Sequence, residues 1–95
     1  MQTWLLINVL SDAEFDQAHI PGSYNIPLDD PDFEERVEEL VGNLARKVVL
    51  YSEGPEDEAS MLAAERLEKV GFSDVADYEG GLEEWVATGY DIESS

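Results

Sequence analysis

Short apolar runs alternate along this chain with segments whose apolar positions recur every three or four residues. The runs with the length and aliphatic or aromatic content of strands are at 4–9, 23–26, 48–51 and 75–78. The segments between and after them have a helical period and begin near Ser11, Asp30, Ala59 and Leu82. Strands that alternate with helices predict an α/β fold with a mainly parallel sheet.

Local signals mark the ends of these predicted helices. Ser11 and Glu14 stand three residues apart, as in a capping box, in which side chains satisfy the first free N–H groups. Asp30 followed by Pro31 predicts a helix that has Asp30 as its N-cap. The apolar face of that helix is expected to consist of Phe33, Val37, Leu40 and Leu44. The next helix, at 59–70, is expected to bury Ala63, Leu67 and Val70.

The composition fits one small domain with a large negative charge. The chain has 95 residues, of which 43% are hydrophobic, and we expect a single domain over 1–95. The 23 acidic and 5 basic residues give a net charge of −18, which argues against binding to nucleic acid or an anionic membrane. The acids are spread along the chain, as in the halophilic-type composition of proteins from a salty cytoplasm.

The sequence also limits where the protein is expected to be located and which chemistry it can perform. No stretch approaches the ~20 apolar residues of a membrane helix, and the first residues lack the basic start and cleavage site of a signal peptide. We therefore expect a cytoplasmic protein. The chain contains no cysteine, so neither disulfides nor thiol chemistry is expected, and no cofactor is predicted.

The stretch KVVLYSEGPEDEASMLAA, at 47–64, predicts a buried strand, a polar loop and a helix. Such a loop is the usual place for an α/β protein to bind an anion or to hold a nucleophile. We therefore take as the candidate site Ser52, Glu53, Gly54, Pro55, Glu56, Asp57, Glu58, Ala59 and Ser60. The spacing of its acids matches no loop pattern for Ca²⁺ or Mg²⁺, so no metal is predicted. Ser60 is expected to cap the helix rather than to touch a substrate.

Three segments together carry a family resemblance. They are LLINVLSDAEFDQAHIPGSYNIPL, KVVLYS and AAERLEKVGFSDVADYEGGLEEWVATGY, and they lie between Leu5 and Tyr90. In this order and spacing they resemble the rhodanese-like family of single-domain sulfurtransferases. The resemblance implies a three-layer α/β/α fold with a small, mainly parallel sheet of four to five strands. Family members usually have another strand and helix before the first segment, so the resemblance also implies an N-terminally trimmed form with an exposed sheet edge.

The resemblance implies a chemistry that residue 52 does not support. Family members have a cysteine at the first loop position, and its thiolate takes a sulfane sulfur from a donor such as thiosulfate. The loop N–H groups and the helix N-terminus stabilise the anion. Here that position is Ser52, and a hydroxyl neither forms a persulfide nor acts as a nucleophile without a neighbouring base. His19, the one histidine of the chain, corresponds to a structural turn of the family, so no catalytic triad is expected.

Other positions depart from the family pattern in the same direction. The aspartate and arginine that usually follow the first matched strand correspond to Asn8 and Leu10. A second loop cysteine of the longer family variant corresponds to Asp57. The loop acids would repel an anionic substrate by roughly 1 kcal/mol per nearby exposed charge in water.

These observations lead to three hypotheses. The leading one is a rhodanese-fold domain without sulfurtransferase activity, which binds an unknown protein partner as a regulatory or scaffolding module. The alternative is a thiosulfate or persulfide sulfurtransferase that acts on a small sulfur-containing anion, and whose nucleophilic cysteine was replaced by Ser52 in this chain. A third is binding of an anion or a phosphopeptide to the loop N–H groups without catalysis.

Overall fold

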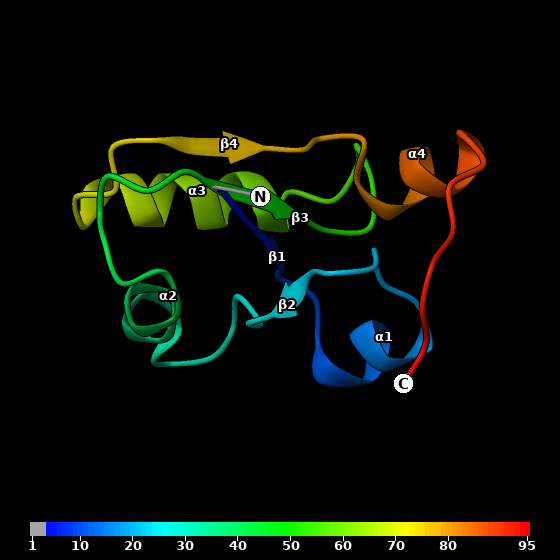
Figure 1. Ribbon diagram of the computed structural model, residues 1–95, viewed down its shortest axis with the longest axis horizontal. Coiled ribbons are helices and arrows are strands. Elements are labelled where there is room, and N and C mark those ends of the chain that lie inside the picture. Colours follow the sequence, from blue (N-terminus) through cyan, green and yellow to red (C-terminus); the bar gives the residue numbers. More distant parts are fainter. Residues whose placement is uncertain (1–3) are drawn as a thin grey trace.

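The predicted α/β fold is confirmed in a computed structural model, which describes residues 4–95 (Figure 1). The strands are β1 (Leu5–Asn8), β2 (Tyr24–Asn25), β3 (Val48–Tyr51) and β4 (Val75–Asp77). The helices are α1 (Asp12–Gln17), α2 (Phe33–Val41), α3 (Ala59–Lys69) and α4 (Gly81–Ala87). All strand pairs are parallel, and the four strands lie in the order β2-β1-β3-β4. In Figure 1, α2 and α3 lie on one side of this sheet and α1 and α4 on the other, which gives the three expected layers.

The face of the sheet that α2 and α3 cover carries the larger core. Leu5 and Ile7 of β1 and Val48 and Leu50 of β3 point into it, because alternate side chains of a strand share a face. The helices contribute Phe33, Val37, Val41, Ala63 and Leu67. All of these residues are buried, so this face supplies most of the apolar burial.

The opposite face carries a smaller and more polar core. Its buried residues are Leu6, Ile20, Tyr51 and Leu82. The hydroxyl of Tyr51 accepts a hydrogen bond from the N–H of Ile20 (3.0 Å) and lies 2.8 Å from Oγ of Ser23. Tyr51 therefore ties the end of β3 to the turn that follows α1.

The capping box of α1 is confirmed, whereas the expected start of α2 is wrong. Oγ of Ser11 accepts from the N–H of Glu14, and the carboxylate of Glu14 accepts from the N–H of Ser11. The helix α2 begins at Phe33 rather than after an N-cap at Asp30. The carboxylate of Asp30 instead accepts from the N–H of Asp32 (2.8 Å), so it stabilises the turn that precedes the helix.

Two residues expected in the core are exposed. Leu44 is 41% exposed and Val70 is 40% exposed. The chain leaves the helical path at Gly42, which has a φ of 77°, before Leu44 can continue the apolar face of α2. Val70 is the C-cap of α3, and Gly71 turns the chain immediately after it. Among the described residues, no helix is long and apolar enough to cross a membrane.

Candidate functional site

The candidate loop joins the carboxyl end of β3 to the N-terminus of α3, as the sequence predicts. Ser52 is its first residue and is only 1% exposed. The hydroxyl of Ser52 lies 3.3 Å from Oγ of Ser60 and 3.5 Å from the carbonyl oxygen of Asp57. The candidate hydroxyl is therefore buried inside the loop and hydrogen-bonded to the loop itself.

The carboxylate of Asp57 faces two N–H groups of this loop. Its Oδ1 accepts from the N–H of Ala59 at 3.0 Å, and its Oδ2 lies 3.5 Å from the N–H of Glu53. The N–H of Asp57 in turn donates to the carbonyl of Gly54 (3.0 Å). An internal anion thus bridges the start of the loop and the N-terminus of α3, where negative charge is favoured.

The expectation that Ser60 caps α3 is wrong. Ser60 is the second residue of the helix, and its side chain is buried against Ser52. The N-cap residue is Glu58, and its side chain makes no capping hydrogen bond. The carboxylate of Asp57, one residue before the N-cap, instead accepts a hydrogen bond from the N–H of Ala59, the first residue of the helix.

The N-terminus of α4 holds the loop from the other side. The N–H of Leu82 donates to the carbonyl of Ser52 (3.0 Å), and that of Glu83 donates to the carbonyl of Glu53 (2.9 Å). This approach requires a glycine at Gly81, where φ is 59° and a Cβ would lie 2.6 Å from the carbonyl oxygen of Ser52. The absence of a side chain at Gly81 therefore permits this close contact.

An open hollow of about 370 Å³ lies over the loop and is lined almost entirely by acids. Its lining residues are Gly54 together with five carboxylates, which we call the acidic mouth: Glu14, Glu53, Glu56, Asp57 and Glu83. Glu14 and Glu83 were not among the predicted site residues, since only the fold brings α1 and α4 to the loop. The one local signal was the position of Glu83 two residues after the Gly80-Gly81 pair. No basic side chain lines this hollow, so it disfavours anions.

A second hollow, of about 230 Å³, lies on the side of the loop that faces β4. It is lined by Pro55, Asp57, Glu58, Ser60, Met61, Asp77 and Glu79. Oδ1 of Asp77 is buried and has no hydrogen-bond partner within residues 4–95. Over the same residues, no group of three or more His, Cys, Asp or Glu side chains is arranged to hold a metal ion.

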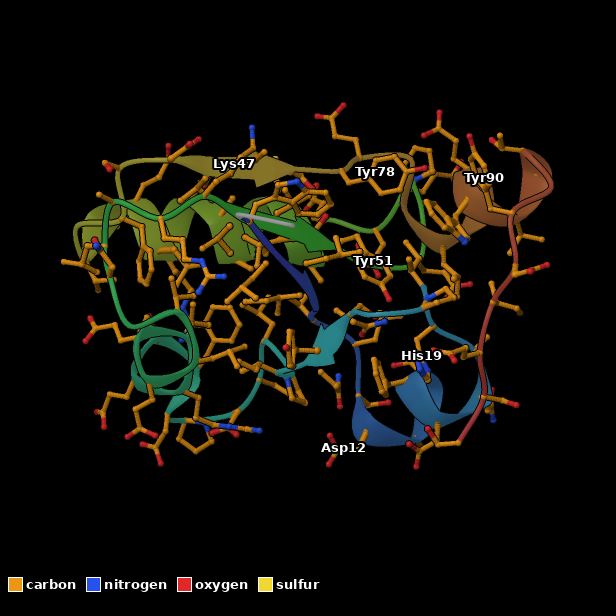
Figure 2. The ribbon with its side chains drawn as sticks, in the orientation of Figure 1. Asp12, His19, Lys47, Tyr51, Tyr78 and Tyr90 are labelled. Atoms are coloured by element: carbon orange, nitrogen blue, oxygen red, sulfur yellow. The ribbon has the colours of Figure 1, made fainter. Side chains whose placement is uncertain are left out.

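His19 has the structural role that the sequence predicts. It is 7% exposed, its ring stacks on Phe15 with centroids 3.8 Å apart, and its Nδ1 donates to the carbonyl of Phe15 (2.7 Å). Its backbone pairs with Glu93 of the C-terminal segment, beside which it lies in Figure 2. In the described part of the chain no hydrogen bond joins His19 to Ser52, so this imidazole is not a base for that hydroxyl.

The positions of the missing family aspartate and arginine hold neutral residues that brace the backbone. Oδ1 of Asn8, which is fully buried, accepts from the N–H of Leu10 (2.9 Å). Nδ2 of Asn25 donates to the carbonyl of Leu10 (2.9 Å), and Leu10 itself is buried. These contacts fix the turn after β1 without bringing any charge to the loop.

Comparison with known proteins identifies similar chains. The family model described as "Rhodanese-like domain" matches residues 1–88. The rhodanese-like domain of the Alr3790 protein from Anabaena is 26% identical, with a TM-score of 0.86, and the match covers 97% of this chain and 93% of that one. A rhodanese with anions from E. coli is 25% identical, with a TM-score of 0.80 and coverages of 97% and 99%. No curated protein matches this chain.

One further similar structure belongs to a much longer protein. The thiosulfate sulfurtransferase from Pseudomonas aeruginosa is 28% identical to this chain and superposes with a TM-score of 0.86. The match covers 97% of this chain but only 17% of that protein. The similarity therefore concerns one domain of the longer enzyme.

Proposed function

Because this chain belongs to the rhodanese-like domain family, we propose that it is a member without sulfurtransferase activity that serves as a binding or regulatory module. The observation that carries the proposal is Ser52, which stands where the family's chemistry needs a thiolate. A serine hydroxyl becomes a nucleophile only beside a base. The groups around this hydroxyl are Oγ of Ser60 and the carbonyl of Asp57, and neither of them is a base.

The loop donors support the same proposal. An anion bound by the family's loop is stabilised by N–H groups at the helix N-terminus. Here the N–H groups of Glu53 and Ala59 face the carboxylate of Asp57. An incoming thiosulfate would have to displace that carboxylate and would meet the charges of the acidic mouth.

The direct test is a turnover assay with thiosulfate and cyanide, in which thiocyanate is followed. We expect a rate equal to that of the uncatalysed reaction, both for the natural chain and for Ser52→Ala. Turnover by the natural chain above the rate of Ser52→Ala would overturn the proposal.

The alternative, a sulfurtransferase whose cysteine was replaced by Ser52, is separated from the proposal by two variants. If only the nucleophile is missing, Ser52→Cys alone should gain the mass of a persulfide sulfur when incubated with thiosulfate. If Asp57 also blocks the loop, the double variant Ser52→Cys/Asp57→Asn should gain that mass and the single variant should not. Ser60→Cys is the matched control, because it places a buried thiol next to residue 52 but on the first turn of α3 instead of at the end of β3.

A further inference from the structure

An aromatic groove lies on the face of the sheet that carries α1 and α4, away from the acidic mouth. It encloses about 300 Å³ and is lined by Trp4, Leu6, Ile20, Val49, Tyr78, Trp85 and Tyr90. None of these residues is charged. Large apolar side chains reach the surface here, since Tyr90 is 58% exposed and Trp4 is 37% exposed. Apolar clefts rich in Trp and Tyr are typical of binding surfaces.

Contacts within the domain hold the aromatic side chains of the groove in place. Nε1 of Trp85 donates to the carbonyl of Asp91 at 2.7 Å, and burial together with the nearby carboxylate of Glu84 raises the pKa of Tyr78. The rings of Trp85 and Tyr90 pack against each other with centroids 4.6 Å apart. Figure 2 shows Tyr78 and Tyr90 side by side at this end of the molecule. The groove is therefore a preformed apolar surface in which a hydrogen bond and a ring contact hold Trp85 in place.

Acidic residues adjoin several of the residues that line this apolar surface. Glu79 follows Tyr78 in the chain, and the carboxylate of Glu84 lies near the Tyr78 hydroxyl, whose pKa it helps to raise. Asp91 follows Tyr90, and the exposed carboxylate of Glu93 lies 3.9 Å from Nε2 of His19, the residue before Ile20 of the groove. A second copy of this chain would bring another net charge of −18 to such a rim. Charge complementarity therefore favours a basic partner over self-association.

We propose that the aromatic groove is the docking site of a basic protein segment. Such a segment inserts one or two apolar side chains between Tyr78, Trp85 and Tyr90, and its lysines or arginines face the surrounding acids. A volume of about 300 Å³ suits a few anchoring side chains rather than a folded surface. This inference rests on the proposed function as a binding module and adds the site and the chemistry of the partner.

The test uses three synthetic peptides of equal length, titrated into the protein by calorimetry and by NMR of the indole N–H groups. The first peptide combines lysine and leucine in an amphipathic helical pattern, the second has glutamate for lysine, and the third has serine for leucine. We expect the lysine–leucine peptide to bind most tightly and to shift the indole signal of Trp85.

Groove variants separate docking from general attraction to an acidic protein. Trp85→Leu, which keeps an apolar side chain, and Tyr90→Ala, at an exposed position, should each weaken the binding of the lysine–leucine peptide by about tenfold or more. Leu62→Ala is the matched control, because Leu62 is an exposed aliphatic residue on α3 that does not line the groove. Its affinity should equal that of the natural chain.

Several results would overturn the inference. Equal binding of the lysine–serine peptide would show attraction by charge alone, and equal binding of the glutamate–leucine peptide would show that charge has no role. A dimer of the natural chain that Tyr90→Ala abolishes would mean that a second copy fills the groove. The thiocyanate assay is independent of these titrations. Turnover there would overturn the lack of catalysis, whereas failure of the lysine–leucine peptide would overturn the groove as the docking site.

Discussion

The two faces of the sheet differ in what they bury and in what they leave open. Among residues 4–95, the buried apolar cluster under α2 and α3 has 12 members, whereas the cluster under α1 and α4 has 4. The smaller cluster includes the hydroxyl of Tyr51 and borders the aromatic groove. The candidate loop lies at the carboxyl end of β3 and is held by α4, so it belongs structurally to this second face.

This difference suggests that one face of the sheet mainly stabilises the fold and that the other provides binding surfaces. Apolar burial without polar interruption is the main source of folding free energy, and the α2–α3 face provides most of it. The other face combines hydrogen-bonded polar groups, close backbone contacts and exposed rings, which are features of binding surfaces. Substitutions on the first face should therefore affect stability most, and those on the second should affect it less.

The largest contrast should come from the same substitution on both faces. Leu67→Ala removes a fully buried side chain from the larger core and should cost about 4 kcal/mol of unfolding free energy. Leu82→Ala should cost about 2 kcal/mol, because Leu82 borders an open hollow into which neighbours and water can move. Urea unfolding of both variants measures the difference. Equal losses would contradict the proposed division between the faces.

A smaller effect is expected where α4 approaches the loop. Gly81→Ala should cost roughly 3 kcal/mol, because a left-handed φ and a Cβ 2.6 Å from the carbonyl of Ser52 both oppose an alanine. Gly42→Ala is the control, since Gly42 has a φ of 77° but nothing within 4 Å of its Cβ position. It should lose only about 1 kcal/mol, from backbone strain. Thermal or urea unfolding compares the two, and equal losses would mean that the contact with the loop carries no cost.

Much of the fold was predictable because helix caps and strands are marked by residues close together in the sequence, and because the order of segments resembles a known family. The capping box of Ser11 and Glu14 lies within one turn, and short apolar runs identified every strand. The exposure of Leu44 and Val70 was not predictable from helical period alone. It depends on the residue at which Gly42 and Gly71 turn the chain out of each helix.

The site was predictable in position but not in its contacts. The order of strand, loop and helix placed Ser52 correctly at the end of β3. The bridge from the carboxylate of Asp57 to Glu53 and Ala59 depends on the backbone conformation of the whole loop, which composition does not determine. Glu83 lines the acidic mouth because α4 packs against the loop, and this contact joins segments that are distant in the sequence.

The polar core of the second face offers a test of intermediate size. Tyr51→Phe removes the hydroxyl that accepts from the N–H of Ile20 and contacts Oγ of Ser23, and it leaves that buried N–H without a partner. The loss should be about 1–3 kcal/mol. Tyr24→Phe is the control, because Tyr24 is 46% exposed, and it should lose less than about 0.5 kcal/mol. Urea unfolding measures both, and a neutral Tyr51→Phe would show that the hydroxyl network does not stabilise the turn after α1.

The smallest effect concerns the ion pair that joins α2 to α3 on the first face. Nε and Nη2 of Arg66 donate to the two carboxylate oxygens of Glu34 at 2.8 and 2.7 Å, and this hydrogen-bonded guanidinium lowers the pKa of Glu34 below its usual 4.5. A lowered carboxylate pKa adds stability above the unfolded-state value and loses it as the pH falls through the folded-state value. The side chains are 28% and 38% exposed, so Glu34→Gln should cost at most about 1 kcal/mol at neutral pH.

The pH dependence and a matched charge control complete this last prediction. The stability difference between the natural chain and Glu34→Gln should shrink as the pH falls from 4.5 through the lower folded-state pKa, below which Glu34 is protonated in both states. Glu35→Gln removes the same charge from an exposed neighbour and, in a chain of net charge −18, should be neutral or slightly stabilising. Urea unfolding of the natural chain and both variants between pH 3 and 7 measures these differences. A Glu34→Gln variant that matches Glu35→Gln at every pH would mean that solvent screening cancels the ion pair.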